Sequence, residues 1–216
     1  MKKTIAVIGL GRFGRAVAKE LQSKGHDVVG MEQNEDIVNT VVQDIPNALI
    51  LDATNRQALD AADLASFDIV VVAIGGNQQA SILATLLLKE IGVPYVVAKA
   101  QNTYHEIILM RVGADRVVQP EKEMGTRLAR SLASPNVLDY MSLGQGYSVT
   151  ELKAPHAMVG KSLEALDMRR KYGVNVLAVK NGQDINAVPK GSDVILADTV
   201  LVVAGSDQAV DKLRTM

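Results

Sequence analysis

The feature that most limits the fold is a glycine-rich hexapeptide near the start of the chain, Gly9-Leu10-Gly11-Arg12-Phe13-Gly14. It follows an apolar run, Thr4–Ile8, that predicts a strand, and it opens an amphipathic stretch, Gly14–Lys24, that predicts a helix. In such a turn the first glycine allows a tight bend, the second lets a phosphate approach the backbone, and the third lets helix and strand pack closely. The sequence therefore predicts a Rossmann-type unit that binds a nucleotide.

The pattern that follows extends this unit into a larger sheet. Short β-branched runs alternate with amphipathic segments, as expected for parallel strands covered by helices on both faces. The predicted strands are Thr4–Ile8, Asp27–Met31, Ala48–Leu51, Ile69–Ala73, Tyr95–Lys99 and Arg116–Val118. The predicted helices are Gly14–Lys24, Asn34–Val42, Arg56–Ala62, Gln79–Ile91, Tyr104–Val112 and Glu121–Leu132. The fold class is therefore α/β, with a doubly wound parallel sheet.

The pattern changes near Ser134-Pro135, which divides the chain into residues 1–134 and 135–216. Segment Asn136–Gly146 is interpreted as a connector. A small α+β domain follows, with strands Ser148–Leu152, Val176–Val179 and Thr199–Ala204, a helix over Leu163–Lys171, a hairpin turn at Asn181-Gly182 and a closing helix from Ser206. Because a domain of roughly 70 residues has a small core, part of its apolar surface is expected to be buried against a second copy.

Composition narrows the classes of partner. The net charge is −1, so there is no electrostatic case for binding nucleic acid or an anionic membrane. There is no cysteine, which excludes disulfides, thiolate metal sites and cysteine nucleophiles. Since no apolar run reaches the roughly 18 residues of a membrane span, we expect no direct membrane insertion and action at a membrane only through a partner.

The sequence offers no obvious catalytic set. The three histidines, His26, His105 and His156, are scattered without the spacing of metal ligands. A dehydrogenase also needs a substrate domain, for which the second part of the chain is small. We therefore expect a protein that senses a nucleotide and is not an enzyme. The alternatives are a small NAD-dependent oxidoreductase and a free-standing nucleotide sensor.

Charged residues at the ends of the predicted strands indicate how a nucleotide would be held. Glu32 ends the second strand, about 20 residues after the glycines, where a carboxylate accepts hydrogen bonds from ribose hydroxyls and repels the 2′-phosphate of NADP. Its alternative is a surface glutamate in a Rossmann look-alike. Arg12 and Arg15 stand at the positive end of a helix, which indicates a terminal phosphate nearby or simply two solvated arginines. Asp52, in Asp52-Ala53-Thr54, either contacts adenosine or caps the helix near Arg56.

In combination these residues resemble the RCK (KTN) domain family, whose members regulate potassium conductance. The segments that carry the resemblance are Ile5–Gly14, Glu32, Asp52-Ala53-Thr54, Val71–Gly75, Lys99–Asn102, Gly113–Glu121, Gly160–Leu163, Leu166-Asp167 and Tyr172–Val176. They cover nearly the whole chain, and the second half is similar to the RCK C-terminal domain. The nearest class is the cytosolic regulatory subunits of bacterial Ktr-type potassium uptake systems.

This resemblance implies an assembly and a way of working. It implies a homo-octamer, a tetramer of dimers, that docks as a ring under a membrane potassium-translocating subunit. The chain would then be cytoplasmic and peripheral to the inner face of the cell membrane. ATP and ADP would compete for the Rossmann site, where NAD or NADH also binds in the family. ATP would favour an active ring shape, and ADP an inactive one.

The resemblance also assigns residues. The nucleotide-binding residues would be Gly9, Gly11, Arg12, Phe13, Gly14, Glu32, Asp52, Ala53 and Thr54. Glu121 would help to hold a divalent cation, Mg²⁺ or Ca²⁺, near the γ-phosphates of ATP across a dimer, although from sequence alone it is only a carboxylate in the first turn of a helix. Some relatives bind cyclic di-AMP, and the matching positions are Asp167, Arg169, Asn175, Val176 and Pro189. A plain dimer interface would need the same residue types.

Overall fold

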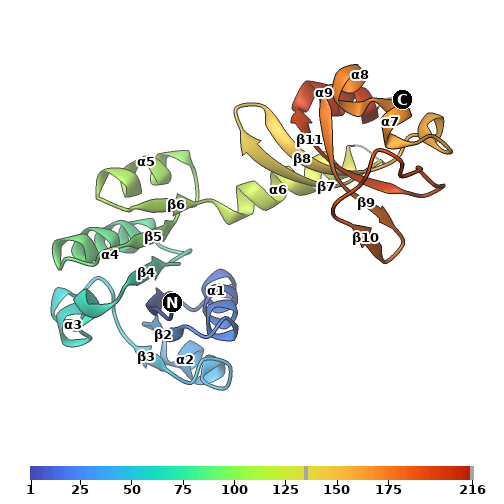
Figure 1. Cartoon of the computed structure of the whole chain (residues 1–216). Coiled ribbons are helices and arrows are strands. Elements are labelled where there is room, and N and C mark those ends of the chain that lie inside the picture. Colours follow the sequence, from blue (N-terminus) through green and yellow to red (C-terminus); the bar gives the residue numbers. More distant parts are fainter. Residues whose placement is uncertain (134–135, 215–216) are drawn as a thin grey trace. The chain divides into compact units, whose positions relative to one another are not determined.

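The computed structural model describes residues 1–133 and 136–214 (Figure 1). The chain divides into two compact units, Met1–Glu121 and Lys122–Met216. The boundary predicted between Ser134 and Pro135 lies outside the described residues. In the part of the chain that the structure describes, no helix has both the length and the apolar character needed to cross a membrane.

Unit 1, Met1–Glu121, is a parallel six-stranded sheet in the order β3-β2-β1-β4-β5-β6. Its strands are β1 (Thr4–Ile8), β2 (Asp27–Glu32), β3 (Ala48–Ile50), β4 (Ile69–Val72), β5 (Val96–Lys99) and β6 (Arg116–Val118). Its helices are α1 (Arg12–Ser23), α2 (Glu35–Val41), α3 (Arg56–Ala61), the 3-10 helix η1 (Leu64–Ser66), α4 (Gln78–Glu90) and α5 (Thr103–Arg111). The order reverses between β1 and β4, which is the doubly wound Rossmann topology. The predicted α/β fold is confirmed.

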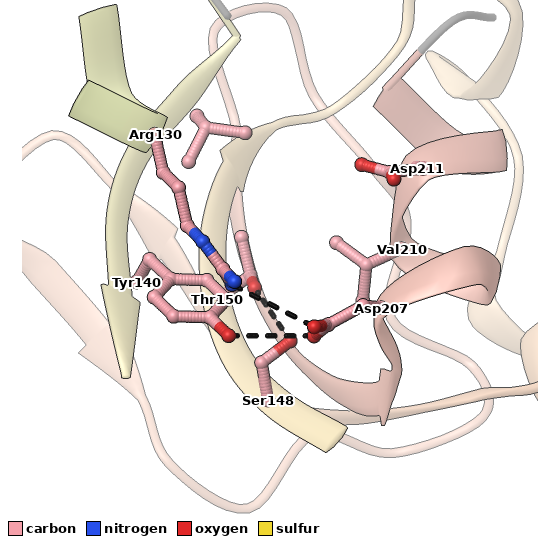
Figure 2. A pocket seen from close by; sticks show the side chains of 8 residues that line it. Arg130, Tyr140, Ser148, Thr150, Asp207, Val210 and Asp211 are labelled. Carbon is pink, nitrogen blue, oxygen red and sulfur yellow. Dashed lines mark hydrogen bonds and ion pairs between the residues drawn. The ribbon is translucent and has the colours of Figure 1, made fainter. Parts of the chain in front are cut away.

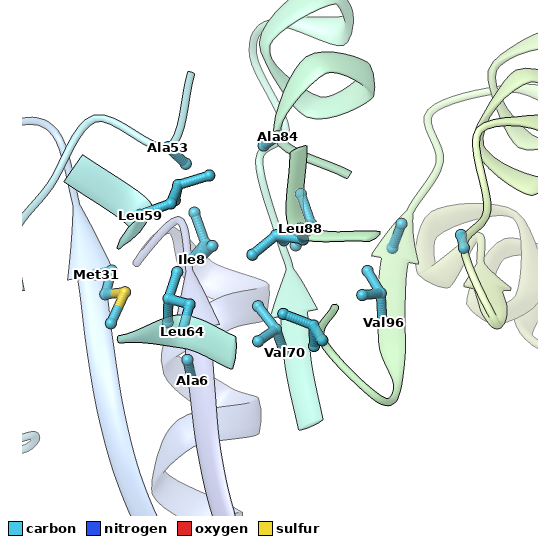
Figure 3. Close-up of a cluster of buried hydrophobic side chains, with 14 of the residues drawn as sticks. Ala6, Ile8, Met31, Ala53, Leu59, Leu64, Val70, Ala84, Leu88 and Val96 are labelled. Carbon is cyan, nitrogen blue, oxygen red and sulfur yellow. The ribbon is translucent and has the colours of Figure 1, made fainter. Parts of the chain in front are cut away.

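Alternate residues of the central strand β1 belong to two separate cores. Ile5 and Val7 pack in the cluster that α1 and α2 cover, whereas Ala6 and Ile8 pack in the cluster of α3, η1, α4 and α5. Figure 3 shows the second of these clusters. Because successive side chains of a strand point to opposite faces, a strand with apolar residues at every position requires a cover on both faces. That is why the β-branched runs lack a polar alternation.

Four helices of unit 1 begin in the same way. Asparagine side chains at positions 34, 55, 77 and 102 accept hydrogen bonds from the first-turn N–H groups of α2, α3, α4 and α5. The N-cap residue of α1 is instead Gly11, and within the described part of the chain no side chain caps this helix. A glycine at this position leaves the first N–H groups of α1 without side-chain acceptors.

Unit 2 contains an antiparallel five-stranded sheet in the order β10-β9-β11-β8-β7. Its strands are β7 (Val137–Gly144), β8 (Tyr147–Lys153), β9 (Val174–Asn181), β10 (Asp184–Asn186) and β11 (Val200–Ser206). Its helices are η2 (His156–Met158), α7 (Leu163–Leu166), α8 (Met168–Tyr172) and α9 (Asp207–Arg214), and α6 (Pro120–Leu132) leads into it. The predicted α+β character and the hairpin at Asn181-Gly182, where β9 turns into β10, are confirmed.

Two expectations for unit 2 are wrong. The segment interpreted as a connector is the edge strand β7, which pairs with β8 along most of its length. Only Val137 of this strand is buried, so the strand lacks the apolar alternation that would have marked it. The single helix predicted over Leu163–Lys171 is two short helices, because Asp167 between them is in the left-handed conformation with φ 44°.

Candidate nucleotide-binding site

In the glycine-rich turn between β1 and α1, the backbone leaves no room for a Cβ atom at Gly9 or Gly14. Gly9 has φ 92°, and a Cβ there would lie 3.0 Å from the backbone of Ala73 at the end of β4. A Cβ on Gly14 would overlap the carbonyl oxygen of Gly9. The close packing of helix and strand predicted for Gly14 is therefore confirmed.

Gly11 stands in a different setting from its neighbours. A Cβ built on this residue would meet nothing within 4 Å among the described residues. Its φ of −68° and ψ of −173° are open to any residue. Neither the backbone angles nor the packing of the chain therefore require glycine there. A requirement for glycine would have to come from something that approaches the backbone from outside, at the uncapped end of α1, where N–H groups and the helix dipole favour an anion.

Glu32 ends β2 beside this turn, as predicted. One carboxylate oxygen, Oε2, accepts a hydrogen bond from the N–H of Leu10 at 2.9 Å, and Oε1 accepts one from the N–H of Asn34 at 3.2 Å. An ionised carboxylate has about four acceptor positions, so hydroxyl donors can still bind to Glu32. The side chain thus supports the loop and remains able to accept hydrogen bonds from a ribose.

The two arginines of the loop have separate roles. Arg15 donates from Nε to the carbonyl oxygen of Leu10 at 2.7 Å and from Nη2 to Thr40 at 3.3 Å. These hydrogen bonds hold the glycine-rich turn against α2. The sequence had predicted either a nearby phosphate or a solvated side chain for Arg15, and not this structural role. Arg12 is exposed and, within the described ranges, forms no hydrogen bond or ion pair. The sequence provides the loop with one structural arginine and one whose donors are open to a ligand.

Asp52 and Thr54 form a local turn after β3. Asp52 Oδ1 accepts hydrogen bonds from the hydroxyl of Thr54 at 2.7 Å and from its N–H at 2.9 Å, and these bonds lower the pKa of Asp52. The alternative that Asp52 caps the next helix is wrong, because Asn55 caps α3. Ala53 is buried. A contact with adenosine stays a prediction.

Lys99, the last residue of β5, is a residue that sequence reasoning missed. Its Nζ lies 2.5 Å from Oε1 of Glu121 in the first turn of α6, and 5.8 Å from the centroid of the Phe13 ring in the glycine-rich turn. The hydrogen bond from Lys99, and more weakly the charge of Arg12, lower the pKa of Glu121. A lysine that ends an otherwise apolar strand was the available signal, since ligands of such sheets bind at the carboxyl ends of strands.

Glu121 is the residue predicted to hold a divalent cation. In the residues that the structure covers, no group of three or more histidine, aspartate or glutamate side chains lies together in the manner of a metal site. Glu121 as a cation ligand stays a prediction.

The residues predicted for cyclic di-AMP lie on three segments of unit 2. Asp167 and Arg169 belong to the α7–α8 region, Asn175 and Val176 to β9, and Pro189 to the loop after β10. Asp167 forms an ion pair at 2.8 Å with Arg170. Within the described chain no hydrogen bond or ion pair joins any two of the five. The cyclic di-AMP site remains a prediction.

Unit 2 also has a cavity of about 220 Å³ between α6, β7, β8 and α9 (Figure 2). The guanidinium of Arg130 lies 3.8 Å from the centroid of the Tyr140 ring and 3.7 Å from Asp207, and the hydroxyl of Tyr140 lies 3.4 Å from the same carboxylate. Arg130 and Asp207 therefore neutralise each other, and a second carboxylate, Asp211, also lines the cavity. The arrangement joins α6 and β7 to α9.

Models of two known domain families match most of this sequence. The TrkA-N domain matches residues 5–120 and the TrkA-C domain matches residues 149–216. The chain belongs to the RCK family, with a TrkA-N and a TrkA-C domain. The resemblance to RCK domains is thereby confirmed. Ktr system potassium uptake protein C of Bacillus subtilis is 45% identical over 206 residues, which are 95% of this chain and 93% of that protein.

Solved structures of RCK proteins are similar to this one. The GsuK RCK domain has a TM-score of 0.70 at 18% identity, over 100% of this chain and 47% of that chain, which shows a shared fold. The crystal structure of GsuK bound to ADP has a TM-score of 0.53 at 26% identity, over 60% of this chain and 33% of that chain. GsuK, an RCK relative of similar fold, thus binds ADP.

Proposed function

We propose that this RCK chain is the nucleotide-sensing regulatory subunit of a potassium uptake system. One observation carries the proposal: α1 begins, uncapped, at a glycine whose surroundings are open, in a chain 45% identical to a potassium uptake protein. Phosphate groups are the ligands that best satisfy the free N–H groups at such a helix start. The potassium-translocating membrane subunit would be its partner.

The site residues divide the nucleotide between them. Glu32 would accept hydrogen bonds from the ribose, and the turn of Asp52, Ala53 and Thr54 would lie along adenosine. Arg12 would bind terminal phosphates, and Glu121, with Mg²⁺ or Ca²⁺, would distinguish ATP from ADP near a dimer seam. The open donors of Arg12 and the position of Glu121 near that arginine support this division.

The assembly proposed is a ring of eight chains, built as a tetramer of dimers, on the cytoplasmic face of the membrane. A ligand shifts a two-state assembly only by the contacts that it makes in one state and not in the other. ATP and ADP differ by one phosphate, so the contacts of that phosphate must carry the difference. Cyclic di-AMP bound to unit 2 would be a second, separate input.

Arg12→Ala is expected to weaken ATP binding far more than AMP or adenosine binding. A charge-assisted hydrogen bond contributes roughly 1.5–3 kcal/mol, which corresponds to a loss of about 10-fold to 100-fold for ATP. Isothermal calorimetry with the three ligands measures this, and Arg56→Ala, which removes an exposed arginine at the start of α3, serves as the matched control. Equal losses for all three ligands would show that Arg12 supports the loop and does not bind phosphates.

Potassium flux tests the function directly. In vesicles that carry the cognate membrane subunit, adding this protein with ATP and Mg²⁺ is expected to raise potassium flux, and adding it with ADP to lower it. Vesicles with the membrane subunit alone provide the baseline for both nucleotides. Flux that does not respond to the protein with either nucleotide would contradict the regulatory function.

The same loop and Glu32 would also hold NAD, so a small NAD-dependent oxidoreductase is the second candidate. It differs from the first in one measurable respect, the transfer of hydride. NADH absorbance followed across a panel of carbonyl and hydroxyl compounds distinguishes the two. We expect no turnover above the rate without protein.

A further inference from the structure

We propose that Lys99 is a phosphate-binding residue of the nucleotide site, and that Glu121 occupies its ammonium group when no phosphate is there. The inference rests on the proposed function, because it requires that a nucleotide binds at the start of α1. In this proposal, a bound phosphate takes the place of the Glu121 carboxylate beside the Lys99 ammonium, and Glu121 is released.

The placement of Lys99 is the first support. It ends β5 at the carboxyl edge of the sheet, and its Nζ lies 5.8 Å from the centroid of the Phe13 ring in the glycine-rich turn. A Cβ on Gly75, which follows β4, would lie 3.5 Å from the same Nζ. The ammonium group is therefore surrounded by the turn and by the end of β4, on the sheet edge where parallel α/β sheets bind ligands.

The unequal burial of the ion pair is the second support. The side chain of Lys99 is 11% exposed, whereas that of Glu121 is 69% exposed. A buried ammonium needs an anion beside it, while an exposed carboxylate is readily solvated without its partner. Another anion can therefore replace Glu121, because Lys99 would keep a counter-charge and Glu121 would return to water.

A phosphate on the N–H groups of α1 is the anion best placed for this exchange. Phe13 lies in the first turn of α1 and also beneath the ammonium of Lys99, so the helix start and the lysine are neighbours. Arg12, in the same turn, lies near enough to Glu121 for their charges to interact. Once displaced, the carboxylate of Glu121 is free for a cation, which makes cation binding depend on phosphate binding.

The competing explanation is a structural ion pair that ties the start of α6 to β5. It predicts that loss of either partner reduces stability and leaves the affinity for phosphates unchanged. The exchange predicts opposite effects of the two partners on phosphate affinity, and none on adenosine.

Calorimetric titrations of the full chain with ATP, ADP and adenosine, in chelator without divalent cations, separate the two explanations. We expect Lys99→Gln to weaken ATP and ADP by about 10-fold or more, the effect of losing a charged hydrogen bond. We expect Glu121→Gln to tighten both several-fold, since the competing anion is lost. Adenosine should be unaffected by either change, and Lys99→Arg should retain most of the phosphate affinity.

The double variant gives the decisive comparison, because residues that act on each other show non-additive effects. In Lys99→Gln, the further change Glu121→Gln should no longer tighten ATP binding. Glu123→Gln, which removes another exposed carboxylate of α6, is the control and should leave ATP affinity within about two-fold of the parent protein. The side chain of Glu121 is itself 69% exposed, and glutamine leaves Lys99 an amide oxygen as acceptor, so this arm is informative even if the Lys99 variants fold poorly.

The outcomes distinguish this inference from the proposed function. If the parent protein binds ATP and Glu121→Gln leaves its affinity unchanged or weaker, the exchange is wrong while nucleotide sensing stands. If the two changes are additive, the lysine and the glutamate act independently, which also overturns it. If the parent protein binds no nucleotide, both the exchange and the proposed function are wrong.

Discussion

Gly11→Val is expected to abolish the binding of ATP, ADP and NAD while the chain stays folded. The backbone angles of Gly11 suit valine, and a Cβ there meets nothing within 4 Å in the described chain. The added methyl groups would fill the space over the first N–H groups of α1, so a phosphate could no longer reach them. Losing several N–H contacts to a charged group corresponds to a fall in affinity of more than about 100-fold.

Two measurements check this result together. Calorimetry with each nucleotide reports the affinity, and circular dichroism with a thermal melt reports the fold. Gly125→Val is the matched control, because Gly125 lies on α6 in unit 2, and a Cβ there also meets nothing within 4 Å in the described chain. Unchanged affinities in Gly11→Val would place the nucleotide site elsewhere.

Gly14→Ala, three residues further on, is expected to destabilise unit 1 itself. Its single added methyl group would overlap the carbonyl oxygen of Gly9, and a further contact at 3.2 Å would be made with Cβ of Ala73. Because the obstructing atom is backbone in a tight turn, α1 must move away from β1. We expect a loss of about 3 kcal/mol or more, seen as a fall in Tm on the order of 10 °C.

Gly125→Ala adds the same methyl group to a helix with open space around it. It should raise stability by about 0.5–1 kcal/mol, because alanine favours the helix. The comparison therefore separates the effect of the clash from the effect of replacing a glycine. A Tm of Gly14→Ala within about two degrees of the parent protein would mean that the turn adapts, and that Gly14 is not needed for packing.

Much of unit 1 could be predicted because its signals are local. The six strands, the helices between them and the turn at Gly9–Gly14 follow from the period of apolar residues and from glycine spacing, and the structure confirms each. The position of Glu32 at the end of β2 could be predicted in the same way. Its hydrogen bond to Leu10 could not, because it joins residues that only the fold brings together.

The predictions that failed depended on contacts or conformations without a local signal. β7 is an edge strand with one buried residue; Leu138, Met141 and Leu143 are exposed and its pairing with β8 shifts register, so its apolar residues do not alternate regularly. Asp167 takes a backbone conformation that aspartate adopts only occasionally, and it breaks a segment with otherwise helical periodicity. Lys99 ends an apolar strand, which is a local signal, but its ion pair with Glu121 joins two elements that only the fold brings together.

The hydrogen bond between Glu32 and Leu10 restricts how the ligand preference of this fold can change. A shift toward nucleotides with a 2′-phosphate would require loss of the carboxylate that repels it. The same substitution would take the acceptor from a part-buried N–H group of the glycine-rich turn, which costs about 1–3 kcal/mol. Discrimination against a 2′-phosphate and the geometry of the glycine-rich turn thus both depend on the side chain of Glu32. A variant that binds a nucleotide with a 2′-phosphate would therefore need another acceptor for the N–H of Leu10.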